Sequence, residues 1–193
     1  INCGSLSSSV DEQGRTWQKD SYSTTGSIYV SWWMLFSRGQ GRIYQSYRYM
    51  PSQHSDTPLR YSIPVPAGRT YEVKLYFTET WNPFRGPRQV DVYLGEKLVF
   101  EDLEIISDAS SAMGRTASMT VPYQRDGSFM GTMDIAISSK KDNPLLAAIE
   151  IHQVDMPTTA IPTPAPIAPV TEEPTTVAPT IMTPTASPTI SPS

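Results

Sequence analysis

Apolar and polar side chains alternate along several short stretches of this chain. In residues 71–78, Val73, Leu75 and Phe77 alternate with mostly polar neighbours, and this period of two is typical of a strand with one buried face. No long stretch has the apolar spacing of a helix, and turn signals such as Pro66-Ala-Gly68 separate the strand-like stretches. The pattern predicts an all-β antiparallel sandwich with strands at residues 28–33, 41–49, 59–65, 69–78, 89–94, 97–100, 117–121, 133–137 and 145–154.

Composition divides the chain near Met156. Residues 1–156 hold every aromatic side chain, whereas residues 157–193 contain ten prolines and ten threonines but no aromatic, glycine or basic residue. We therefore expect one folded domain, 1–156, and one tail, 157–193, that the prolines hold in an extended polyproline II form. Threonine interleaved with proline is typical of an O-glycosylated extracellular stalk, and an unmodified linker is the alternative. The candidate glycosylation sites are Thr163, Thr175, Thr176, Thr180, Thr183, Thr185 and Thr189.

The net charge, the apolar runs and the cysteine count limit what this chain can bind and how it can be held together. The net charge is −4, so the chain lacks the basic surface that nucleic acid requires. No apolar run reaches the roughly 20 residues that insert across a bilayer. Cys3 is the single cysteine, which excludes an internal disulfide, and its place in the first strand favours burial. The chain begins at Ile1 within that strand, and we interpret it as a processed piece of a secreted precursor.

Catalytic and metal-binding signatures are not found. No strand is followed by a nucleophile elbow, a Walker loop or a dinucleotide-binding glycine motif. The histidines, His54 and His152, do not form a zinc-type pair. The acidic residues between Glu101 and Asp108 lack the spacing of a calcium loop, which favours a solvated strand edge. We therefore predict a protein that is not an enzyme and that needs neither cofactor nor metal.

Seven pieces of the sequence form an ordered set: Ile1-Asn-Cys-Gly-Ser5, Gly14-Arg-Thr-Trp17, Tyr61–Gly68, Tyr71–Glu79, Val90–Leu94, Phe100–Ile105 and Lys141–Ile151. In this order they resemble malectin and the malectin-like domains of plant receptor kinases. The resemblance covers essentially all of residues 1–156 and none of the tail. It implies a β-sandwich of the galactose-binding, jelly-roll type, and a lectin site made by aromatic side chains and one aspartate on loops at one end.

The resemblance assigns a carbohydrate site residue by residue. The family's aromatic pair falls on Trp81 and Asn82, so that only the first position is aromatic here. Its later tyrosine falls on Tyr49, its aspartate on Asp142 and its earlier tyrosine near Tyr29. A sugar ring needs a flat aromatic to stack on and a carboxylate or amide to bind its hydroxyls, and these residues supply both. The alternative is that Trp81 caps the core and Asp142 only makes a turn before Pro144.

Three arginines accompany these aromatic residues in sequence. Arg48 precedes Tyr49, and Arg85 and Arg88 follow Trp81. A guanidinium group pairs in two-pronged fashion with carboxylate or sulfate, so an acidic glycan is one hypothesis for the ligand. The alternative is that the three arginines solubilise exposed loops.

The sequence and the resemblance together predict a non-catalytic, extracellular lectin module on a proline-rich glycoprotein stalk. Its expected partner is a glycan of the cell surface or matrix. A structural alternative is a subunit of an extracellular filament that assembles with its own or another chain through the packed polyproline II tail. A third interpretation is a peptide-binding receptor ectodomain, because malectin-like domains of plant receptor kinases are associated with signalling peptides.

Overall fold

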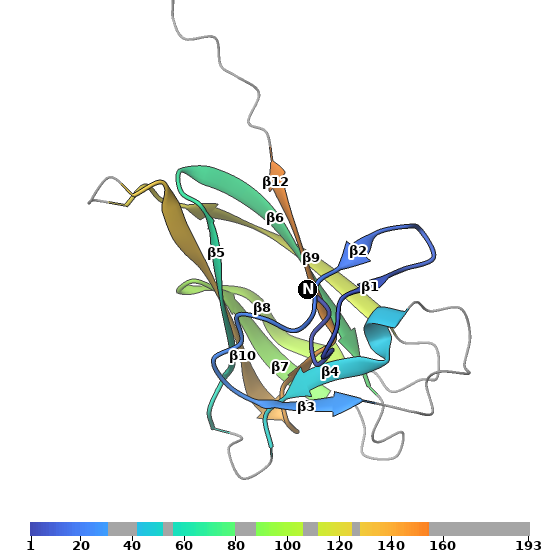
Figure 1. Ribbon diagram of the computed structural model, residues 1–193. Helices are drawn as coiled ribbons and strands as arrows, with labels where there is room; N and C mark the ends of the chain where they lie inside the picture. Colours follow the sequence, from blue (N-terminus) through green and yellow to red (C-terminus); the bar gives the residue numbers. More distant parts are fainter. Residues whose placement is uncertain (31–41, 52–55, 80–87, 106–111, 125–127, 155–193) are drawn as a thin grey trace, which may run out of the picture. The chain divides into compact units, whose positions relative to one another are not determined.

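A computed structural model describes residues 1–30, 42–51, 56–79, 88–105, 112–124 and 128–154 (Figure 1). These residues belong to one compact unit, Ile1–Pro157, and a second unit, Thr158–Ser193, lies outside the described residues. Several sequence predictions also fall outside them: Trp81, Asn82, Arg85, the polyproline II tail and its seven candidate threonines.

Nearly all regular structure in the described residues is β-strand. The exception is one short 3-10 helix, η2 (Arg42–Tyr44). The strands are β1 (Ser9–Val10), β2 (Thr16–Trp17), β3 (Ser27–Val30), β4 (Ser46–Tyr49), β5 (Leu59–Pro66), β6 (Arg69–Thr78), β7 (Arg88–Leu94), β8 (Lys97–Ile105), β9 (Ala112–Val121), β10 (Met130–Lys141), β11 (Leu145–Leu146) and β12 (Ala148–Val154).

Two antiparallel sheets form the sandwich, with strand orders β5-β10-β7-β8 and β12-β6-β9. The alternation in β6 buries Val73, Leu75 and Phe77, each with at most 1 % of its surface exposed. Met133 and Ile137 of β10 belong to the same buried cluster and come from the opposite sheet. Burial of these apolar side chains is the main force that holds the two sheets together. The predicted antiparallel sandwich is confirmed.

A third, smaller sheet has the order β11-β4-β3 and lies at the lower end of the sandwich in Figure 1. Tyr49 of β4 pairs with Ser27 of β3 on one side and with Leu145 of β11 on the other. Tyr47 is opposite Tyr29. Because paired residues share a face and alternate residues return to it, the three tyrosines are displayed on the same side of this sheet.

The predicted strands differ from the structure in three informative places. Residues 42–44 of the predicted strand 41–49 are η2. The predicted strand 145–154 is divided at Ala147, whose N–H donates to Tyr76 of one sheet, so β11 and β12 belong to different sheets. The two-residue strands of the β1–β2 hairpin were not predicted, because two residues are too few to show a period.

Candidate functional site

Aromatic rings gather on one face of the small sheet. The rings of Tyr29 and Tyr47 are stacked, with centroids 4.9 Å apart and planes at 26°. Tyr49 meets Tyr47 edge to face at 6.0 Å. Tyr47 is buried against Leu145, whereas Tyr29 and Tyr49 are half-buried and keep part of their surface in solvent. The face therefore has a fixed centre and two accessible rings.

The loop between β10 and β11 adjoins this face. Leu145 pairs with Tyr49, and the backbone N–H of Met50 donates to the carbonyl oxygen of Pro144 at 3.0 Å. Asp142 has φ 65°, a left-handed conformation that aspartate tolerates better than most residues. Its Oδ1 accepts the N–H of Asn143 at 2.8 Å. Its Oδ2 accepts no hydrogen bond from any described residue, and the side chain is 31 % exposed.

An ion pair joins the residues on either side of segment 80–87, which contains Trp81. Glu79 follows β6 and Arg88 opens β7, and the distance from Arg88 Nε to Glu79 Oε2 is 2.8 Å. The Arg88 guanidinium also donates to the carbonyl oxygen of Asn143 and lies 3.6 Å from Asp142 Oδ1. Glu79 and Arg88 are therefore linked to each other, and Arg88 links them to the Asp142 loop.

The structure describes three of the five predicted carbohydrate-binding residues. Tyr29 and Tyr49 share a face, and Asp142 precedes Pro144 and Leu145, which pair with the end of β4. The other two, Trp81 and Asn82, lie outside the described residues. Sequence reasoning did not include Tyr47 in the site, although the alternation Tyr47-Arg-Tyr49 places both rings on one side of a strand.

Arg48 and Arg88 have other partners than the predicted anionic ligand. Arg48 Nε lies 2.7 Å from Asp20 Oδ2, and its Nη1 donates to the carbonyl oxygen of Gly26 at 2.8 Å. Asp20 also accepts the hydroxyl of Tyr61, so this pair belongs to a part-buried network. Arg88 is only 5 % exposed and is paired with Glu79. This geometry does not support either arginine as a free cation for an acidic glycan.

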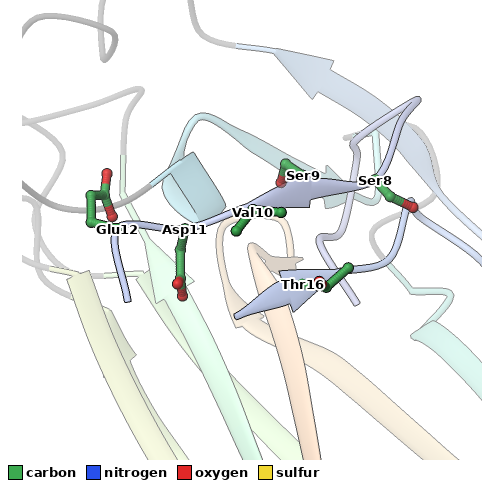
Figure 2. A pocket seen from close by; sticks show the side chains of 6 residues that line it. All are labelled: Ser8, Ser9, Val10, Asp11, Glu12 and Thr16. Carbon is green, nitrogen blue, oxygen red and sulfur yellow. The ribbon is translucent and has the colours of Figure 1, made fainter. Parts of the chain in front are cut away.

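A second polar region surrounds the β1–β2 hairpin, where Ser8–Glu12 and Thr16 line a hollow of about 600 Å³ (Figure 2). Asp11 and Glu12 point to opposite sides of the chain there. Burial alone would raise the pKa of Asp11, but hydrogen bonds from Trp17, Arg15 and Gln13 outweigh it and lower the pKa to about 2. Both oxygens of the Asp11 carboxylate thus accept hydrogen bonds from residues of the hairpin itself.

A groove of about 490 Å³ lies between this hairpin, β5 and β12. Its carboxylate, Glu150, accepts the Tyr76 hydroxyl and lies 2.9 Å from His152 Nε2 and 3.6 Å from an Arg15 nitrogen. Burial and the bond to Glu150 raise the pKa of the Tyr76 hydroxyl to about 12. Since the charged groups of this groove are satisfied by one another, the tyrosine face beside Asp142 is the better candidate for a ligand site.

Residues 1–149 match the family model of the malectin domain. The chain belongs to the malectin domain family. Its fold is similar to the ectodomain of ANX2 from Arabidopsis thaliana (TM-score 0.66, 14 % identity), covering 81 % of this chain and 49 % of that one. It is also similar to the plant receptor-like kinase FER (TM-score 0.67, 17 % identity), with 81 % and 49 % covered.

The chain is also similar to a structure in which the plant peptide RALF23 is in complex with FER and LLG2 (TM-score 0.63, 17 % identity). That match covers 79 % of this chain and 47 % of the other chain. This malectin domain spans about half the length of the receptor ectodomains that it matches. No curated protein matches the sequence. The matches show no enzyme family. In the ranges that the structure describes, no helix has the length and hydropathy of a membrane span.

Proposed function

We propose that this malectin domain is a non-catalytic, extracellular lectin module that recognises a glycan of the cell surface or matrix. One observation carries the proposal: the half-buried rings of Tyr29 and Tyr49 lie on the sheet that the Asp142 loop adjoins. Asp142 Oδ2 accepts no hydrogen bond from a described residue. The family membership supports it, because malectin itself binds glycans.

Each part of this arrangement suits a sugar. The C–H face of a pyranose stacks on an aromatic ring, and Tyr29 and Tyr49 offer rings that are partly in solvent. Asp142 Oδ2 then accepts hydroxyl hydrogens at the rim of the sugar. Trp81 and Asn82 complete the site in this proposal, because Arg88, which follows their segment, lies 3.6 Å from Asp142 Oδ1 and is paired with Glu79, which precedes it.

The charge of the described site favours a neutral sugar. Arg48 and Arg88 are committed to Asp20 and Glu79, and Asp142 adds a negative charge. Arg85, the third arginine considered for an acidic glycan, lies outside the described residues, and its contact with an anionic group remains a separate proposal. A uronic or sulfated sugar would be repelled by the carboxylate that the proposal places in the site.

The tail contributes a separate proposal, based on its composition. A segment of alternating threonine and proline suits an O-glycosylated stalk that carries the lectin domain. The seven threonines named above are the proposed attachment sites. Assembly of a filament through this tail is the structural alternative.

Peptide binding is a second candidate function. A structurally similar receptor, FER, was solved in complex with the peptide RALF23. At 17 % identity this similarity supports a common fold and does not transfer the ligand. A peptide would use the same tyrosine face, with Asp142 binding a basic side chain or a backbone N–H.

A glycan array and a peptide array, both probed with the 193-residue chain, separate the two functions. We expect binding to neutral oligosaccharides that is lost in Tyr49→Ala and weakened, but still measurable, in Asp142→Asn. Tyr123→Ala is the matched control, because this tyrosine is 75 % exposed and lies beside Gly68 in the turn between β5 and β6, far from β4 in Figure 1. Binding to peptides without binding to any sugar would overturn the lectin proposal.

A further inference from the structure

Arg88 connects the start of β7 with Glu79 and with the Asp142 loop. Its Nε donates to Glu79 Oε2, and one of its terminal nitrogens donates to the carbonyl oxygen of Asn143. The same terminal nitrogen lies 3.6 Å from Asp142 Oδ1. This one side chain therefore connects Glu79, the last described residue after β6, to the Asp142 loop.

Arg88 and Glu79 are buried, and this burial suits a role in positioning the neighbouring Asp142. Arg88 is 5 % and Glu79 3 % exposed, whereas the Asp142 side chain is 31 % exposed. The desolvation of a buried ion pair largely offsets its attraction, so such a pair contributes little net stability but restricts geometry. The planar guanidinium holds several acceptors in fixed directions, which the single ammonium of lysine cannot do.

We propose that Arg88 is the positioning residue that orients Asp142 for ligand binding; this inference rests on the proposed function. Asp142 Oδ1 accepts the Asn143 N–H and faces Arg88, and these two contacts favour the orientation in which Oδ2 is directed away from Arg88 and Asn143. Oδ2 is the oxygen that accepts a sugar hydroxyl. Arg88 acts through Asp142 and Asn143 and does not touch the ligand itself.

A double-mutant cycle in the 193-residue chain tests this role. The probe is the neutral oligosaccharide that gives the strongest signal on the array, titrated calorimetrically into wild type, Arg88→Lys, Asp142→Asn and the double variant. We expect Arg88→Lys to weaken binding about tenfold, or about 1.4 kcal/mol. In the Asp142→Asn background the same change should cost less than about twofold, because coupled residues are not additive. Arg60→Lys is the control, since this exposed side chain makes no ion pair with a described residue.

Two results would overturn the positioning role. A tenfold loss in both backgrounds would mean that Arg88 acts independently of Asp142. A lower melting temperature with unchanged affinity would mean that Arg88 only stabilises the fold. If Arg88→Lys does not fold, Glu79→Gln replaces it, because it removes the buried counter-charge while keeping the guanidinium. The same non-additive loss is then expected.

Hydrogen exchange of the Asn143 amide tests the geometry without a ligand. This amide donates to Asp142 Oδ1, so it should exchange faster in Arg88→Lys, whereas the amide of buried Ile137 should not change. Faster exchange at Asn143 in a protein whose wild type binds no sugar would overturn the lectin function and keep the positioning of the carboxylate. Unchanged exchange at Asn143 would overturn the positioning even if the wild type binds sugar.

Discussion

The ring of Tyr29 lies on the ring of Tyr47, with centroids 4.9 Å apart. The two residues face each other in the register of β3 and β4, and Tyr47 is in turn buried against Leu145 of β11. A buried tyrosine at the centre of a three-stranded sheet thus supports the accessible rings on either side. Tyr47 makes this face rigid, and in the proposed lectin Tyr29 and Tyr49 are the rings that contact the sugar.

This division of roles predicts different effects for neighbouring alanine substitutions. Tyr47→Ala should destabilise the protein by about 3 kcal/mol, because it removes a large buried ring. Tyr49→Ala should cost less stability, since that ring is half in solvent, but should abolish sugar binding. Urea unfolding and calorimetric titration of both variants check this. Equal losses of stability would contradict it.

Gly4 tests how closely the turn at Cys3 and Gly4 approaches this sheet. A Cβ built at Gly4 would lie 2.5 Å from the carbonyl oxygen of Tyr47. Gly14 is a matched control, because it has φ 79° against 80° at Gly4 but has nothing within 4 Å of an added Cβ. Gly14→Ala should cost about 1 kcal/mol for the left-handed backbone alone. Gly4→Ala should cost clearly more in urea unfolding, and an equal cost would contradict the close approach.

Core burial predicts a strong contrast between two phenylalanines. Phe77 is fully buried in β6, whereas Phe129 is 88 % exposed. Phe77→Ala should lower the free energy of unfolding by about 3–5 kcal/mol. Phe129→Ala should change it by less than about 0.5 kcal/mol. Denaturant unfolding followed by fluorescence measures both values, and a similar cost at the two positions would contradict the described core.

The pKa of Asp11 predicts part of the acid response. Its folded value of about 2 lies below the ordinary value of about 3.9 for an unfolded chain. The hydrogen bonds of the ionised carboxylate therefore stabilise the fold above about pH 4, and this contribution is lost as the pH falls toward 2. In Asp11→Asn the urea midpoint should fall less steeply between pH 4 and pH 2. An identical slope in wild type and variant would contradict this.

The thiol of Cys3 should be unreactive in the native protein. Burial raises its pKa to about 12, so the nucleophilic thiolate is scarce at pH 8 and reagents have no access to it. A chromogenic disulfide reagent should label no thiol in the folded chain and one thiol per chain in 6 M urea. Rapid labelling without urea would contradict the predicted and observed burial of Cys3.

The fold could be predicted largely because its evidence is local. The alternation of Val73, Leu75 and Phe77 is visible within β6, and each of these residues reaches the core as the period of two requires. The division of the last strand at Ala147 was not visible, because it depends on hydrogen bonds to Cys3 and Tyr76 from distant parts of the chain.

The site could be predicted only in part, for a similar reason. The resemblance pointed to Tyr29, Tyr49 and Asp142, but their arrangement depends on the register of β3, β4 and β11. Arg88 was interpreted as a candidate ligand for anions because sequence does not show its partners. Glu79 is nine positions away and Asn143 is 55 positions away, and only the packed structure buries the guanidinium between them.

The most direct test of the lectin function is an NMR titration of the 193-residue chain with the best neutral oligosaccharide from the array. The largest amide shifts should fall on Tyr29, Tyr49 and Asn143, and in Asp142→Asn they should require a clearly higher sugar concentration. Shifts confined to the β1–β2 hairpin, or no shifts with any sugar, would contradict a ligand site on the tyrosine face.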